Sequence, residues 1–284
     1  MIHILNKPKR PLIKSVRAFL RMFLLGLLLF IVLFPFLWLL ISSFKSERDI
    51  LSYPPQFFSQ SYSLIQYQTV ITTIPILRYI GNTVCFAGGV VVCSLFFDSM
   101  AGYAFARMRF RGNKTIFRFI LISMMIPGQI LLIPLYVQIT KMGLLDHYAG
   151  LILPRMTTAF GIFMMRSFFV SLPKDLEEAG RIDGENELGI YFKIMLPLAK
   201  PGLISLGIFT LMANWNDLMY PMILTSSTEM RTLPAGLAMF ASDRVAAYGP
   251  TIAGSIISIL PLIFCYAVAQ KVFISGIAMS GMKE

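Results

Sequence analysis

Residues 22–44 form an unbroken apolar run of 23 residues that contains no Asp, Glu, Lys or Arg. A bilayer core of about 30 Å is crossed by about 20 apolar residues in a helix, so this run predicts a transmembrane helix. The whole chain is 56% apolar and 14% charged, whereas a soluble protein carries about 25% charged residues. This composition excludes an ordinary water-soluble domain.

Further apolar stretches follow along the chain. We therefore predict an all-α polytopic membrane protein with six transmembrane helices. The first run is longer than the apolar region of a signal peptide and lacks a small-residue cleavage site, so we expect it to remain as an anchor. The predicted spans are 22–44, 79–106, 119–137, 148–170, 202–224 and 251–270.

The basic residues alternate between the connecting segments, and this pattern predicts the orientation of the chain. One alternate set, 1–21, 107–118, 171–201 and 271–284, holds 17 Lys and Arg, and the other, 45–78, 138–147 and 225–250, holds 6. Lys and Arg accumulate on the cytoplasmic side of membranes, which places both termini there. The net charge of +11 is thus a membrane signature, and we expect no nucleic-acid partner.

Residues with catalytic or metal-binding chemistry are scattered. Cys85, Cys93 and Cys265 are single residues within predicted spans, and we read them as packing residues. His3 and His147 are isolated. We expect no catalytic residue, no metal site and no cofactor bound by this chain.

Proline recurs within the spans. Kinked or broken helices around a transport cavity are one explanation, and ordinary kinked packing is the other. The prolines concerned are Pro35, Pro127, Pro134, Pro154, Pro221 and Pro261.

The cytoplasmic segment 171–201 is richer in structure than a loop. It holds six of the 14 acidic residues. Ser171 is suited to cap a helix over 172–184 that ends at Gly184, with Leu172, Leu176, Ala179 and Ile182 on its apolar side. A second amphipathic piece follows, stopped by Pro197 and Pro201, with Leu188, Tyr191, Phe192 and Met195 on one side.

The acidic pair Glu177 and Glu178 on this hairpin indicates its surroundings. An anionic lipid surface attracts cations, so the pair fits a protein partner with a basic groove better than the membrane. A solvated hairpin without a partner is the alternative.

The sequence EEAGRIDG at 177–184, followed by IMLPLAKP at 194–201, resembles the EAA loop of permease subunits in binding-protein-dependent ABC importers. Gly180 stands where the family usually has Ala. The series GYAFARMRFRGNK from Gly102, NWNDLMYPMIL from Asn214 and TLPAGLAMF from Thr232 is similar to the carbohydrate, maltose-permease type subfamily. The similarity extends from about residue 12 to residue 284.

The resemblance implies a type I ABC importer permease in the inner membrane. It implies a heterodimer with a second permease, two ATPase subunits that use ATP and Mg, and an extracytoplasmic binding protein. The chain has no G-x-x-x-x-G-K-[ST] phosphate loop of its own. The EAA loop would couple ATP hydrolysis to transport through a Glu178 ion pair and the apolar residues of its helix. The residues implied in coupling are Glu177, Glu178, Ala179, Gly180, Asp183, Gly184, Leu196 and Pro197.

The C-terminal GIAMSGMKE is similar to family tails that reach between the ATPases; a frayed end is the alternative.

Four polar or aromatic residues, Asn214, Trp215, Asn216 and Asp217, fall near the middle of the span 202–224. Amides and carboxylates pair with sugar hydroxyls and an indole stacks on a pyranose ring, so they are candidates to line a sugar pathway. Hydrogen bonding between helices is the competing interpretation.

Two more charges, Asp98 and Arg155, lie within predicted spans. They lie at different depths, so a direct ion pair between them has to bridge a gap of several ångströms along the membrane normal. Because a buried charge needs a partner, Arg155 is a candidate to contact an anionic, uronate-type oligosaccharide; a structural pair or a water-lined cavity is the alternative.

Segments 45–78 and 225–250 are candidates to dock the binding protein. The rival to an ABC permease is a stand-alone secondary transporter or channel, for which we see no convincing internal repeat.

Overall fold

The computed structural model describes residues 11–59, 61–242 and 247–280, and these form helices joined by turns. Contacts divide the chain into two compact units. Unit 1 comprises Met1–Val70 with Ala247–Ile256, and unit 2 comprises Ile71–Ala246 with Ile257–Glu284. The predicted ends of the chain fall partly outside this range, since residues 1–10 and 281–284 are not among those described.

Unit 1 contains the N-terminal helices. They are α1 (Pro11–Ser42), α2 (Glu47–Ile50) and most of α3 (Ile65–Thr73), and α15 (Tyr248–Ser280) begins here and continues in unit 2. The carboxylate of Glu47 accepts hydrogen bonds from the backbone N–H groups of Tyr248 and Gly249, at 2.7 and 2.8 Å. A carboxylate at the first turn of a helix satisfies N–H groups that have no partner within it. Glu47 therefore anchors the start of α15.

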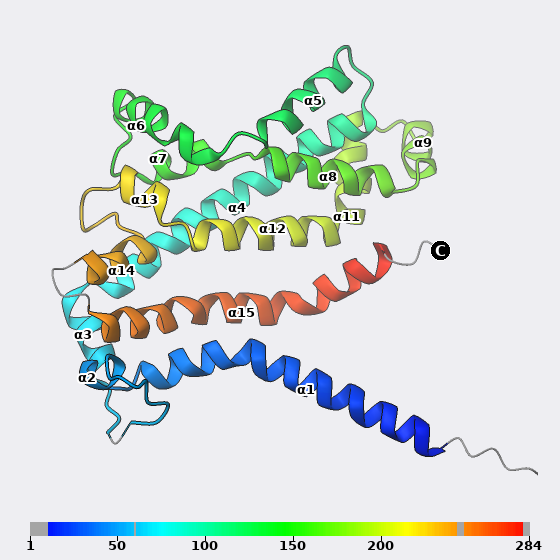
Figure 1. Cartoon of the computed structure of the whole chain (residues 1–284). Helices are drawn as coiled ribbons and strands as arrows, with labels where there is room; N and C mark the ends of the chain where they lie inside the picture. Colours follow the sequence, from blue (N-terminus) through cyan, green and yellow to red (C-terminus); the bar gives the residue numbers. More distant parts are fainter. Residues whose placement is uncertain (1–10, 60, 243–246, 281–284) are drawn as a thin grey trace, which may run out of the picture. The chain divides into compact units, whose positions relative to one another are not determined.

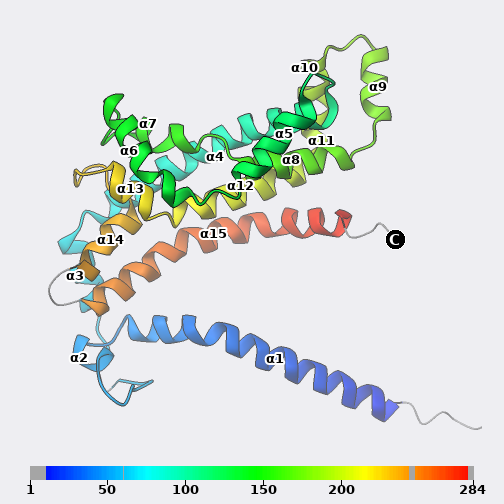
Figure 2. The ribbon, with the colours of Figure 1, turned by 45° about the horizontal axis from the view of Figure 1, so that its top comes forward.

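Unit 2 holds the remaining helices (Figures 1 and 2). They are α4 (Ile76–Arg107), α5 (Asn113–Ser123), α6 (Leu132–Lys141), α7 (Tyr148–Ile152), α8 (Ala159–Ser171), α9 (Asp175–Ile182), α10 (Glu187–Gly189), α11 (Leu196–Leu198), α12 (Lys200–Trp215), α13 (Met219–Leu224) and α14 (Leu233–Ser242). Short 3₁₀ turns at Gly128–Leu131 and Leu153–Arg155 precede α6 and follow α7, and a π-helix, Ile190–Met195, joins α10 to α11.

Helix α4 is the axis of unit 2, because α8 and α12 both pack along it. Gly102 allows the approach of α8: a Cβ on Gly102 would come within 2.6 Å of Cβ of Met165. The core at this end is built from Tyr103, Met165, Phe169 and Tyr191, all nearly or fully buried. Tyr103 and Phe169 meet edge to face with ring centroids 5.6 Å apart. The close packing fixes the ends of α4 and α8 next to each other.

Three described helices are long and apolar enough to cross a membrane: Ala18–Ser42, Ile76–Arg107 and Tyr248–Val268. Three bent pairs meet the same criteria of length and composition: Asn113–Ser123 with Gly128–Lys141, Tyr148–Arg155 with Ala159–Ser171, and Glu187–Leu198 with Lys200–Trp215. The number of spans is six if each bent pair is one span. The all-α fold is as predicted.

Three predicted spans are broken rather than continuous helices. The first is 119–137, where the two helices meet at 91°. Helix α5 ends at Ser123 and Pro127 precedes the next turn. Proline has no N–H to donate to the carbonyl four residues earlier, and it disfavours helical backbone at the preceding residue, so the helix stops here.

The second is 148–170, bent by 48°. Thr158 has extended backbone and its hydroxyl accepts a hydrogen bond from the N–H of Gly161 at 3.0 Å. It therefore acts as an N-cap and starts α8 anew.

The third is 202–224. Helix α12 ends at Trp215 and α13 begins at Met219. Pro221 cannot donate to the carbonyl of Asp217, which removes one of the bonds that would continue the helix.

Candidate functional site

The acidic hairpin forms, with a later start than predicted. Ser171 is the last residue of α8 and does not cap the next helix, which is Asp175–Ile182 rather than 172–184. Leu172 is extended (ψ 150°) because the following Pro173 disfavours helical backbone at the residue before it. The prediction of a cap at Ser171 was wrong for this reason.

The end of α9 follows the prediction. Gly184 has φ +82°, and the N–H of Glu185 donates to the carbonyl of Gly180 at 3.0 Å. This is the 6→1 bond of a glycine-terminated helix, which needs a left-handed residue after the helix.

The second piece of the hairpin differs from the predicted apolar face. Ile190, Tyr191 and Met195 are buried, whereas Leu188 and Phe192 are exposed. The segment is a π-helix, whose wider turn places other residues inward than an α-helix would. The piece ends at Leu198, between Pro197 and Pro201 as predicted, and a 78° bend separates it from α12.

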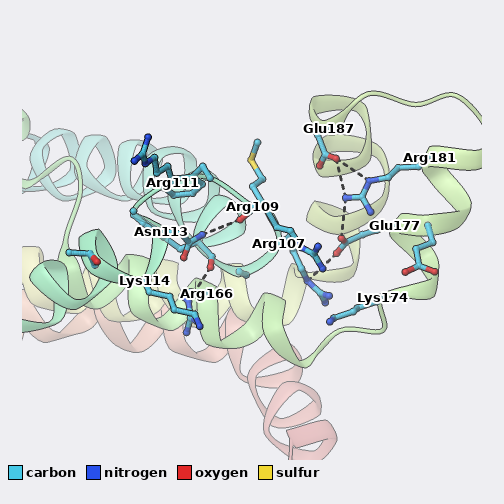
Figure 3. Close-up of a pocket in the computed structure, with 17 residues that line it drawn as sticks. Arg107, Arg109, Arg111, Asn113, Lys114, Arg166, Lys174, Glu177, Arg181 and Glu187 are labelled. Atoms are coloured by element: carbon cyan, nitrogen blue, oxygen red, sulfur yellow. Dashed lines mark hydrogen bonds and ion pairs between the residues drawn. The ribbon is translucent and has the colours of Figure 1, made fainter.

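Glu177 faces the interior of unit 2. Nε of Arg107 lies 3.0 Å from its Oε1, and NH2 of Arg181, one helical turn further along α9, lies 3.7 Å from its Oε2. Arg181 also pairs with Glu187 at 3.0 Å, and Figure 3 shows this chain of charges running from Arg107 to Glu187. Burial raises the pKa of Glu177, against the opposing effect of Arg107 and Arg181. Glu177 therefore attaches the buried face of α9 to the end of α4.

Arg107, the last residue of α4, caps the C-terminal end of α8 by hydrogen bonds to its carbonyl groups. Its Nε donates to the carbonyl oxygen of Phe169 at 3.1 Å, and its NH2 donates to those of Phe169 and Leu172, both at 2.5 Å. The last carbonyls of a helix have no partner within it and attract a cation. One side chain thus ties together α4, α8 and α9.

The opposite face of α9 is exposed. Leu176, Glu178, Ala179, Ile182 and Asp183 all lie on the surface, and the side chain of Ile182 is 85% exposed. Gly180 is on the buried side, where a Cβ would come within 2.7 Å of Cδ1 of Ile194. A side chain here would require Ile194 to shift.

Leu196 and Pro197 occupy the turn between the hairpin and α12, partly buried and exposed respectively. The helices before and after this turn meet at 78°.

Arg155 has a partner other than Asp98. Its NH2 lies 2.7 Å from Oδ2 of Asp217, its NH1 donates to Oδ1 of Asn214 at 2.6 Å, and its guanidinium lies 4.0 Å from the ring centre of Tyr220. These partners come from α12 and the break that follows it. The structural pair, one of the alternatives for Arg155, is therefore present.

Asp98 is fully buried and bonded to neutral groups. Its Oδ1 accepts from Thr157 Oγ1 at 2.6 Å and from the N–H of Thr158 at 3.0 Å, and its Oδ2 accepts from Ser94 Oγ at 2.5 Å. The carboxylate thus lies at the N-terminus of α8, where a negative charge is stabilised. These bonds to Thr157 and Thr158 stabilise the break in the fourth predicted span.

Trp215, the last residue of α12, and Asn216, which follows it, have different surroundings. Trp215 is buried and its Nε1 donates to the carbonyl of Ser258 at 3.0 Å, whereas Asn216 is exposed and donates to Met212. Asn214 and Trp215 therefore do serve hydrogen bonding between helices.

Several residues of these sites were not predicted from sequence. The i,i+4 spacing of Glu177 and Arg181 could have indicated their pairing. Arg107 and Tyr220 gave no such signal, because they are distant in sequence from their partners. In the described ranges, no group of three or more His, Cys, Asp or Glu could hold a metal ion.

Residues 98–278 match the family described as the binding-protein-dependent transport system inner membrane component. The chain belongs to this family.

Two relatives are permeases of named sugar transport systems. The permease is 35% identical to the arabinooligosaccharides transport system permease protein AraQ of Halalkalibacterium halodurans, over 89% of this chain and 92% of the relative. It is 31% identical to the trehalose/maltose transport system permease protein MalG of Thermococcus litoralis, over 90% and 94%.

A solved structure shares the fold of the permease. It is the crystal structure of a bacterial ABC transporter involved in the import of the acidic polysaccharide alginate, 26% identical, with a TM-score of 0.79. The match covers 94% of this chain and 100% of that one.

Proposed function

We propose that the permease forms half of the translocation pathway of an ATP-driven importer for an oligosaccharide. A second permease would supply the other half, two ATPase subunits would bind at α9, and an extracytoplasmic binding protein would deliver the cargo. The observation that carries this proposal is the two-sided construction of α9, buried and charge-paired at Glu177 on one side and exposed at Glu178 on the other.

This construction suits transmission of movement. Arg107 and Glu177 connect α9 to the ends of α4 and α8, while the π-helix and α11 connect it to the start of α12. A partner that pulls on the exposed face would therefore move helices of the pathway together. Packed interfaces of this kind change between discrete arrangements rather than bend gradually. ATP and Mg would be bound by the ATPase subunits.

Glu178→Lys tests the coupling. A lysine at this position would repel a basic groove on the ATPase, whereas Glu178 would attract it. In proteoliposomes containing the complete importer, we expect sugar uptake to fall at least about tenfold, as for the loss of a desolvated charge pair across an interface, while ATP hydrolysis continues. Wild-type uptake by this variant would contradict the proposal.

Glu229→Lys is the matched control. Glu229 is an exposed acid whose backbone carbonyl binds Asn82 and Arg78 near the start of α4, at the other end of that helix from α9. The charge change is the same but lies away from α9, so the ratio of sugar uptake to ATP hydrolysis should remain within about twofold of wild type. Uptake alone is not compared, because 225–250 is a candidate to dock the binding protein.

The cluster around Arg155 bears on the cargo. Asp217 balances the charge of Arg155, and the side chain of Arg155 is 23% exposed. A neutral sugar would contact the Arg155 guanidinium, which is paired with Asp217 and partly accessible, and the ring of Tyr220. An acidic cargo, as in the alginate importer, would have to compete with Asp217.

Arg155→Ala distinguishes the two cargos. If the pair is structural, uptake of neutral and of uronate-containing oligosaccharides should fall by the same factor. A loss confined to the acidic oligosaccharide would instead assign Arg155 to substrate binding.

A further inference from the structure

A large basic cavity lies between the 107–115 segment and the hairpin. Its volume is about 1180 Å³, and the residues that line it include seven Lys or Arg and three Glu, an excess of four positive charges. Figure 3 shows these side chains around it. The coupling role of α9 does not account for the excess.

The pairing within the cavity shows which cations are spare. Glu177 and Glu187 are occupied by Arg107 and Arg181. Arg166 donates to the carbonyl of Phe105 and its guanidinium lies 4.2 Å from the ring centre of Phe117. In the part of the chain that the structure describes, the other cations in the cavity form no ion pair; they are Arg109, Arg111, Lys114 and Lys174.

The basic wall continues into an apolar stripe. Helix α5 begins at Asn113, directly after Arg111 and Gly112, and its Ile116, Phe119 and Ile122 are 46%, 67% and 55% exposed. Positions three apart lie on one face of a helix, so these side chains form a row leading away from the basic end. The N–H groups of the first turn of α5 face the same end and favour an anion.

We propose that this cavity binds the phosphate headgroup of an anionic phospholipid, with the acyl chains along Ile116, Phe119 and Ile122. A soluble anion or an acidic protein segment would use the cations but not the apolar row. A phospholipid uses both, because its phosphate and its hydrocarbon are joined in one molecule. The membrane leaflet on the side of α9 would supply it.

The experiment measures lipid retention by the complete importer. The protein is reconstituted in nanodiscs of phosphatidylglycerol and phosphatidylcholine, extracted in detergent, and examined by native mass spectrometry. We expect phosphatidylglycerol to be retained over phosphatidylcholine. Arg109→Gln combined with Arg111→Gln should lower its retention at least about tenfold, since each basic residue near an anionic surface contributes about 1 kcal/mol.

Matched variants separate binding from folding and from total charge. Arg21→Gln combined with Lys200→Gln removes two exposed charges elsewhere and should retain the lipid. Arg109→Lys combined with Arg111→Lys keeps the charge and should retain it too.

Three results would overturn the proposal. The first is equal retention by the double Gln variant and wild type. The second is displacement of the lipid by millimolar glycerol 3-phosphate, which would indicate a site for a soluble anion. The third is retention by the isolated permease that vanishes when the ATPase subunits are bound, which would assign the cavity to a protein segment.

Discussion

Arg107 and Glu177 form a buried ion pair whose two members should differ in their importance for stability. The side chains are 3% and 5% exposed. Arg107→Met would leave Glu177 buried with Arg181 at 3.7 Å, and would leave the carbonyls of Phe169 and Leu172 without this donor. Removing one member of a buried pair costs about 3–5 kcal/mol.

Glu177→Gln should cost far less. Arg107 would keep its contacts with the two carbonyl groups of the α8 terminus. Because burial raises the pKa of Glu177 despite the two guanidinium groups, the carboxylate is poorly compensated, and an uncharged amide removes part of that penalty. We expect a loss of about 0–2 kcal/mol.

Thermal unfolding of the purified importer in detergent measures the difference. A change of 1 kcal/mol shifts Tm by about 2–4 °C in a chain of 150–250 residues. Arg107→Met should therefore lower Tm by about 6–20 °C, and Glu177→Gln by no more than about 8 °C. Arg118→Met, exposed on α5 and outside the cavity, is the control and should change Tm little. Equal losses for the two pair variants would refute the reasoning.

The pH dependence provides a second check. A carboxyl group whose folded pKa is raised binds its proton more tightly in the folded state, so its penalty is present at high pH and disappears as pH falls through the folded pKa. Without Arg107 the pKa of Glu177 should rise further. The Tm deficit of Arg107→Met should therefore shrink as the pH is lowered from 7 towards the unfolded carboxyl pKa of about 4.3, and a deficit that grows would contradict this account.

Three further predictions concern single polar contacts. Asp98→Ala removes the acceptor of four hydrogen bonds, three from Thr157 and Thr158 at the start of α8 and one from Ser94 of α4, and should destabilise the importer by about 1–3 kcal/mol, measured as a lower Tm. Asp146 accepts four hydrogen bonds from Ser226 and Ser227, which outweigh burial and lower its pKa; stability from this group is present above the unfolded pKa of about 3.9 and lost as pH falls through the lower folded value, and Asp146→Asn at pH 7 should speed hydrogen exchange at both serine amides. Trp215→Phe deletes one hydrogen bond to α15 and should lower stability by about 1 kcal/mol; an unchanged Tm would contradict that bond.

The candidate sites were foreseen in part, and the errors have local causes. Gly184 was predicted correctly as the end of α9 because a positive φ is a property of one residue. Ser171 was wrong as a cap because Pro173 extends the residue before it. The apolar face of the second piece was wrong because its π-helix changes the periodicity on which the prediction depended.

The sequence by itself determined the membrane class, the all-α fold, the family and the position of the acidic hairpin. These follow from composition, from apolar runs of bilayer length and from residues adjacent in the chain. Tertiary structure alone decided that Glu177 faces inward to Arg107, that Arg155 pairs with Asp217 rather than Asp98, and that Asp98 bonds the start of α8. A charge buried in a protein takes the partner that folding brings within reach, and that partner is 70 residues away for Glu177 and 62 for Arg155. Local sequence patterns do not predict pairing between residues so far apart in the chain.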